Sequence, residues 1–190
     1  LLIQNATLVL PDRLVDGDLR VSNGSISIIA AGGGLDPLID ENVIDATGLH
    51  LLPGAIDPHV HFREPGHTDK EDLESGSRAA AAGGVTSFLD MPNNSPNTIN
   101  RHTLERKISL ASTKSVTHHG FFIGATKDNI RDLQSVEGMD GVCGIKVFMG
   151  SSTGDLLVNE QEHLENIFAN TGGIIATHAE DEGRLQQRNA

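Results

Sequence analysis

The stretch Asp57-Pro58-His59-Val60-His61-Phe62-Arg63-Glu64-Pro65-Gly66 carries the most information about the fold and the chemistry of this chain. It ends an apolar run and places two histidines at positions i and i+2. In a β-strand, residues two apart point to the same side, so His59 and His61 can direct two imidazoles at one metal ion. Arg63 follows just beyond the expected strand, where it can meet an anionic substrate. The stretch therefore predicts a strand whose end carries a metal site.

Downstream of residue 51, apolar runs alternate with amphipathic segments. The expected strands are 52–62, 85–91, 116–124, 142–149 and 174–178. The expected helices begin at a capping box over Thr68–Glu71 and after Asn100, Thr126 and Asn159, and glycine pairs at 83–84 and 172–173 end two of them. Strands that alternate with helices indicate a parallel sheet, and near-continuous apolar strands indicate that both of its faces are buried.

Two α/β architectures are compatible with this pattern, an open doubly wound sheet and a (β/α)8 barrel. A barrel normally needs about 250 residues and eight β/α units. The chain has 190 residues and five such units, so we expect it to be a fragment of a longer protein. Residues 1–52 show a different pattern, in which short apolar strands are separated by turns. The turns are expected at Asp16–Asp18 and Asn23-Gly24. We therefore expect a small β layer over 1–52 and an α/β domain over 53–190.

Composition limits the classes of function. The net charge of −12 and the pI of about 5.0 argue against binding to nucleic acid or to an anionic membrane surface. The single cysteine, Cys143, cannot form a disulfide within the chain. No apolar run approaches the roughly 18 residues that span a bilayer, and no secretory signal is visible. These features predict a cytoplasmic protein.

Polar residues interrupt two later strands in the same way as the histidine pair. Lys146 lies within Gly144–Gly150, and His178 ends the run that begins at residue 174. A lone histidine is more often a satisfied core residue than a ligand, but a fully buried lysine is rare unless it is paired. Because the carboxyl ends of parallel strands converge, His59, His61, Lys146 and His178 are expected to form one metal site.

Four segments together resemble the amidohydrolase superfamily and, within it, the dihydroorotases whose two metals are bridged by a lysine. These segments are Pro53–Gly66, Ala79–Ser87, Asp90–Pro96 and Gly144–Gly154. The resemblance covers essentially the whole chain. It implies a (β/α)8 TIM barrel of which about five units are present, preceded by the N-terminal part of a small β-sandwich domain.

The resemblance also implies a centre of two zinc ions. His59 and His61 resemble the ligands of the more buried zinc, and His178 resembles a ligand of the second. Lys146 resembles the lysine that reacts with CO₂ to give a carbamate bridging both metals. That reaction needs a neutral amine, which burial favours by lowering the pKa of a lysine.

Arg63 and Asn93 resemble the residues that hold the carboxylate of the substrate in this family. The implied reaction is the reversible hydrolysis of the cyclic amide of dihydroorotate to N-carbamoyl-aspartate in pyrimidine synthesis. The substrate is thus expected to be a small molecule, and the sequence is compatible with a homo-oligomer. The family takes its general base, an aspartate, from strand eight, so we expect no catalytic base within these residues and an inactive isolated fragment. The alternatives are an allantoinase, a hydantoinase or dihydropyrimidinase, and a non-catalytic homologue that acts as a structural partner.

Overall fold

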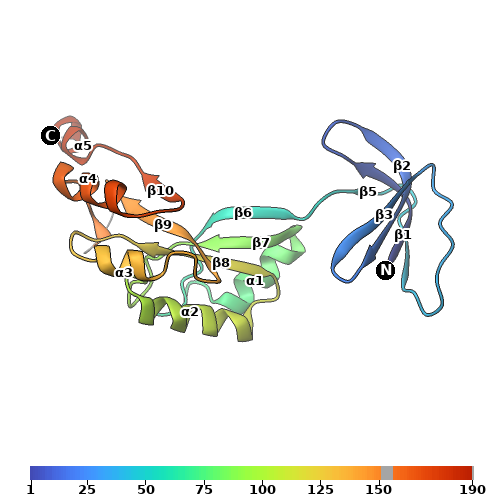
Figure 1. The fold of residues 1–190 in the computed structure, drawn as a ribbon, viewed down its shortest axis with the longest axis horizontal. Coiled ribbons are helices and arrows are strands. Elements are labelled where there is room, and N and C mark those ends of the chain that lie inside the picture. The colour runs from blue at the N-terminus through green and yellow to red at the C-terminus, as the bar shows by residue number, and fades with distance from the viewer. Residues whose placement is uncertain (151–155, 190) are drawn as a thin grey trace. The chain divides into compact units, whose positions relative to one another are not determined.

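The computed structural model describes residues 1–150 and 156–189. The chain divides into two compact units, Leu1–Pro53 and Gly54–Ala190, and each is described by itself (Figure 1). None of the helices that the described residues form is long and apolar enough to cross a bilayer.

The N-terminal unit is a five-stranded sheet built on β1. Its strands are β1 (Leu2–Val9), β2 (Leu14–Ser22), β3 (Ser25–Ala31), β4 (Val43–Asp45) and β5 (His50–Leu51). The order is β3-β2-β1-β4, and β5 also pairs with β1. The first three strands form an antiparallel meander, whereas β4 and β5 join β1 in parallel. This sheet is the expected part of a small β domain.

One of the two predicted turns in this unit is confirmed and the other is wrong. Asn23 and Gly24 form the turn between β2 and β3, both with positive φ. Asp16–Asp18 lies inside β2 instead of in a turn. A Cβ at Gly17 would lie 2.2 Å from the carbonyl oxygen of Ala30, so glycine is present because the neighbouring strand comes close. A glycine inside a strand can report such an approach as well as a turn.

A buried ion pair fastens the 32–42 segment to β2. Arg20 donates from Nε to Glu41 at 2.9 Å and from Nη2 to the carbonyl oxygen of Asp36 at 2.6 Å. Glu41 also accepts from the backbone N–H of Leu38 at 3.0 Å and lies 3.6 Å from the N-terminal amine of Leu1. These contacts, with the hydrogen bond from Arg20 the largest, lower the pKa of Glu41 from 4.5 to about 2.

The C-terminal unit is a parallel β/α array. Its strands are β6 (Ala55–Val60), β7 (Val85–Asp90), β8 (His118–Gly124), β9 (Val142–Phe148) and β10 (Ile175–His178). Its helices are α1 (Leu73–Ala82), α2 (Arg101–Lys114), α3 (Ile130–Ser135), α4 (Gln161–Asn170) and α5 (Glu182–Asn189). Figure 1 shows α1, α2 and α3 covering one side of the sheet.

The strand order β10-β9-β8-β7-β6 decides between the two architectures that the sequence allowed. All four neighbouring pairs are parallel, and each strand pairs with the next one along the chain. A doubly wound sheet reverses its strand order at a switch point, whereas a (β/α)8 barrel winds in one direction. The five strands follow the order of the barrel, as predicted.

The predicted helices are all present, but the first and third begin several residues later than expected, and the fourth begins at Gln161 with Glu160 in place of Asn159 as its N-cap. The first begins at Leu73 with Asp72 as its N-cap, because Asp72 and Ser75 form a reciprocal capping box, and the predicted box over Thr68–Glu71 is wrong. The third begins at Ile130, after Asn129, and not directly after Thr126. The start of α2 after Asn100 is confirmed, and Asn100 forms a capping box with Thr103.

The core of the C-terminal unit lies where the helices pack on the sheet. The phenyl rings of Phe62 and Phe88 meet edge to face with centroids 4.6 Å apart. A Cβ at Gly76 of α1 would lie 2.7 Å from the ring of Phe62, so glycine lets the helix pack against this ring. The helix thereby supports the segment that directly follows His61. The fully buried members of this core are Leu73, Phe88, Leu104, Ala111, Phe121, Ile123, Ala125, Leu133, Val147 and Val158.

Candidate active site

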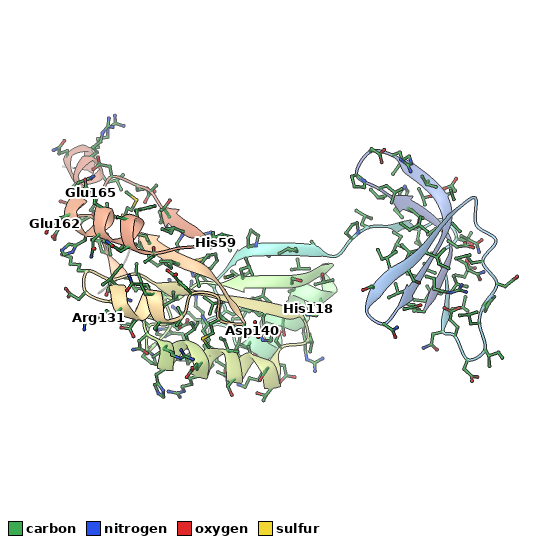
Figure 2. The ribbon with its side chains drawn as sticks, in the orientation of Figure 1. His59, His118, Arg131, Asp140, Glu162 and Glu165 are labelled. Carbon is green, nitrogen blue, oxygen red and sulfur yellow. The ribbon has the colours of Figure 1, made fainter. Side chains whose placement is uncertain are left out.

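The histidine pair lies at the carboxyl end of β6, as the sequence predicts. The imidazole centroids of His59 and His61 are 5.2 Å apart, with the rings inclined by 51°. The carboxylate of Asp57 accepts the backbone N–H of His59 at 3.0 Å, near the end of the strand. Figure 2 shows His118, from the amino end of β8, at the other end of the sheet from His59, so His118 is not part of this site.

Lys146 lies in the middle of the buried part of β9 and is 2 % exposed. Its ammonium lies 5.1 Å from the centroid of the Phe148 ring. Among the residues that the structure describes, no carboxylate pairs with it. Burial lowers the pKa of Lys146, which favours the neutral amine that reaction with CO₂ requires.

Electrostatics connect the residues predicted to form the metal site. The pKa of His59 is lowered by burial and by the charge of Lys146, with a further contribution from His178, while Asp57 opposes the change. The pKa of His61 is lowered mainly by burial and also by the charges of Arg63 and Lys146. Both changes favour the neutral imidazole, which is the form that binds a metal.

His178 ends β10 and contacts a carboxylate, unlike the other predicted metal ligands within the part of the chain that the structure describes. Its Nε2 lies 3.2 Å from the carboxylate of Glu180, and its ring centroid lies 6.3 Å from that of Phe148. Within residues 1–150 and 156–189, no three side chains of the His, Cys, Asp and Glu types form a group that could hold a metal ion. The structure thus brings His59, His61 and Lys146 to one region with His178 near them, without a complete set of ligands from these residue types.

This donor set fits a divalent metal in chemical terms. Neutral imidazoles suit zinc, and a buried lysine without a carboxylate partner among the described residues suits conversion to an anionic carbamate. Part of the motif that follows β9, residues 151–154, lies outside the described residues.

The two residues predicted to bind a carboxylate both lie beside His61. Asn93 places its Oδ1 2.8 Å from Nδ1 of His61. Arg63 is half-buried, and its positive charge contributes to lowering the pKa of His61. A guanidinium with five N–H donors and an amide that can donate two more are suited to hold a carboxylate next to the histidine pair.

Sequence reasoning missed a buried polar network beneath these residues. The ammonium of Lys107, on α2, lies 2.9 Å from the carboxylate of Asp90, 2.8 Å from the carbonyl oxygen of Met91 and 2.5 Å from Oδ1 of Asn94. Lys107 and Asp90 are both completely buried. Burial raises the pKa of Asp90 to about 6 against the opposing effect of Lys107. Spacing gave a signal, because Lys107 lies on the same helical face as Leu104 and Ala111.

A second ion pair joins the loop after β6 to the same helix. The buried carboxylate of Glu64 pairs with Lys114, the last residue of α2, and accepts the backbone N–H of Leu73 at 2.9 Å. Glu64 thereby satisfies an N–H group at the first turn of α1 that has no partner within the helix. The loop that carries Arg63 is therefore held by both α1 and α2.

Comparisons with known proteins agree with this geometry. The model of the Amidohydrolase family matches residues 50–162. A dihydroorotase of Methanosarcina acetivorans is 38% identical over 182 residues, which are 95% of this chain and 38% of that protein. An allantoinase of Deinococcus radiodurans is 38% identical over 194 residues, with 95% of this chain and 40% of that protein covered.

Among solved structures, an L-hydantoinase (dihydropyrimidinase) from Arthrobacter aurescens superposes with a TM-score of 0.84 at 26% identity, covering 98% of this chain and 42% of that one. The chain thus spans about two fifths of the length of the relatives that it matches. The match of the family model over more than half of the sequence, together with the parallel β/α array and the histidine pair at the end of β6, shows that the chain belongs to the amidohydrolase family.

Proposed function

We propose that the protein is a metal-dependent cyclic amidohydrolase that opens the ring of dihydroorotate to give N-carbamoyl-aspartate. The observation that carries this proposal is the position of Arg63 and Asn93, which both border His61. Carboxylate-binding groups beside a metal-binding histidine pair suit a cyclic amide that bears a ring carboxylate. The coarser part of the proposal, hydrolysis of a cyclic amide, rests on the family and on relatives named as dihydroorotase, allantoinase and hydantoinase.

His59, His61 and Lys146 are the residues that would hold the metal, with His178 as a ligand of a second ion. When bound, divalent zinc would supply an activated water at neutral pH and would polarise the scissile carbonyl. Partial burial and the neighbouring positive charges lower the pKa of both imidazoles, which favours the neutral form that binds a metal. Carboxylation of Lys146 would replace a buried amine by an anionic carbamate, whose charge two divalent ions would balance.

Arg63 orients the substrate by holding its carboxylate in the plane of the guanidinium. Asn93 accepts from His61 with its Oδ1 and can direct its amide N–H groups at the same carboxylate. A substrate fixed at this end presents its ring amide in one orientation, which lowers the entropic part of the barrier. We further propose that the reaction serves pyrimidine synthesis in the cytoplasm.

The second candidate is allantoin hydrolysis, because the identity to an allantoinase equals that to a dihydroorotase. Allantoin has no ring carboxylate, and neither has dihydrouracil, a substrate of the dihydropyrimidinase type. The arginine at position 63 therefore favours dihydroorotate over both.

The decisive experiment compares dihydroorotate, allantoin and dihydrouracil as substrates of the whole zinc-loaded protein. We expect the highest kcat/KM with dihydroorotate and a rise in KM for that substrate in Arg63→Ala, because the guanidinium contact is lost. Arg78→Ala, which removes an exposed arginine of α1 paired with Glu74, is the matched control. A preference for allantoin would reject the substrate assignment. Zinc binding without turnover of any of the three compounds would instead favour a structural partner.

A further inference from the structure

The side chain of Asn94 donates to the carbonyl groups of the two residues that flank Arg63. Its Nδ2 donates to the carbonyl oxygen of Phe62 at 3.2 Å and to that of Glu64 at 3.1 Å. Asn94 is buried, and its own backbone directly follows Asn93. One amide group therefore links the backbone that carries Arg63 to the backbone that carries Asn93.

Lys107 determines which way this amide points. Its ammonium has only donors, so the group 2.5 Å away must be the carbonyl oxygen of Asn94 and not the amide nitrogen. The amide nitrogen is then left facing the two carbonyl groups. Lys107 is itself held by a hydrogen bond to the carbonyl oxygen of Met91 at 2.8 Å and by an ion pair with Asp90 at 2.9 Å.

Asp90 completes the connection to the histidine segment. Its Oδ1 accepts the backbone N–H of Phe62, the residue after His61, at 3.1 Å. We call Asn94, Lys107 and Asp90 the buried staple. Asn94 and Asp90 contact the backbone on the two sides of Arg63, and Lys107 contacts both Asn94 and Asp90. All three side chains are buried.

We propose that Asn94 is a positioning residue that sets the spacing between Arg63 and Asn93, and that the buried staple thereby determines preference for a carboxylate-bearing substrate. This inference rests on the proposed function. The physical reason is geometric, because a planar guanidinium binds a carboxylate through paired hydrogen bonds whose strength falls steeply with misalignment. A displaced Arg63 would weaken binding of the substrate carboxylate and leave the rate of ring hydrolysis unchanged.

The next β/α unit contains a matched control. Asn129 is buried to the same extent as Asn94, and its Nδ2 also donates to two carbonyl oxygens, of Ile99 at 2.7 Å and Gly124 at 2.9 Å. Its Oδ1 accepts the backbone N–H of Thr126 at 2.8 Å. None of these carbonyl groups flanks Arg63 or Asn93, although Gly124 pairs with Lys146 of the neighbouring strand, so the control is read from the ratio of the two substrates. A change at Asn129 therefore removes the same bonds without touching the carboxylate-binding pair.

The test uses Asn94→Asp and Asn129→Asp in the whole zinc-loaded protein. Aspartate has the shape of asparagine, keeps the contact to Lys107 and replaces both donated bonds by repulsion between oxygens. For Asn94→Asp, we expect the KM for dihydroorotate to rise at least about tenfold, while kcat for dihydroorotate, the kinetic constants for dihydrouracil and the zinc content stay within about twofold. Asn129→Asp should leave the ratio of kcat/KM for the two substrates unchanged.

Asn94→Ser provides a second variant in case the aspartate prevents folding. Its hydroxyl can donate only one of the two bonds, so a smaller shift in the same direction is expected. Equal losses on both substrates, or an unchanged KM for dihydroorotate, would overturn the inference and leave the proposed function standing. If the wild-type protein does not hydrolyse dihydroorotate at all, the proposed function fails and the inference fails with it.

Discussion

Nδ1 of His61 and Oδ1 of Asn93 lie 2.8 Å apart, so one hydrogen bond joins a predicted metal ligand to a predicted substrate ligand. With Asn93 as the acceptor, His61 carries its proton on Nδ1, and Nε2 is left with a free lone pair. A metal-binding histidine commonly uses its second nitrogen in this way. Neither residue reveals this contact in the sequence, since they are 32 positions apart.

Asn93→Ala should therefore affect metal binding as well as substrate binding. Loss of the acceptor frees the imidazole of His61 to rotate and to change tautomer, and loss of such a partner typically costs 10–100-fold in metal affinity. A zinc titration against a chromophoric chelator measures this effect. Asn166→Ala, at an exposed position of α4, serves as the control. An unchanged zinc affinity would show that the His61–Asn93 contact has no influence on the metal.

Lys146 should be carboxylated when metal is bound. Intact-mass measurement at neutral pH is expected to show an increase equal to one CO₂, absent in Lys146→Met. Metal-free protein should regain its full zinc content only when bicarbonate is added with the zinc, because the proposed carbamate would supply ligand oxygens to the metal. Equal zinc content of the wild type and Lys146→Met would contradict the bridging role.

Lys107→Met should be strongly destabilising. It leaves the carboxylate of Asp90 completely buried without its cation, and removing one member of such a pair costs about 3–5 kcal/mol. Lys107→Met combined with Asp90→Asn removes both charges and keeps the acceptor for the backbone of Phe62, so part of the loss should be recovered. Urea denaturation of the four proteins in a double-mutant cycle measures the coupling. Additive losses would mean that the two charges do not stabilise each other.

Acid should weaken the N-terminal unit through Glu41. Its pKa in the folded protein is about 2, below the usual 4.5, so the folded state binds the proton less readily than the unfolded state. The stability from Glu41 is therefore fully present above pH 4.5 and is lost as the pH falls toward about 2. Thermal midpoints over this range should fall less in Glu41→Gln than in the wild type. Glu162→Gln, which removes an exposed carboxylate of α4, should behave like the wild type.

The sequence was sufficient for the order and type of elements in the C-terminal unit. Apolar runs and caps are local signals, so all five strands and the start of α2 at Asn100 could be predicted. The start of α1 could not, because both Thr68 and Asp72 offer a capping side chain. The structure uses Asp72, while His67 donates back to the carbonyl oxygen of Arg63 and the intervening residues form turns.

The candidate site divides in the same way. His59, His61 and Lys146 interrupt or end apolar strands, which made them visible in the sequence. Lys107 shares a helical face with Leu104 and Ala111, but this spacing alone was not sufficient, because a lysine on a helix normally extends to solvent and its burial depends on Asp90 at the end of β7. Asn94 was also missed, since its function is carried by contacts to backbone groups 30 and 32 positions away.

The buried staple has a consequence for how substrate preference can change during evolution. The side chains that would touch the substrate, Arg63 and Asn93, are distinct from those that hold their backbone in place. A substitution at position 63 or 93 can therefore exchange one ligand chemistry for another while the internal framework of the loops is inherited intact. A lineage of ring-opening enzymes can in this way acquire new substrates through few mutations and at little risk to folding.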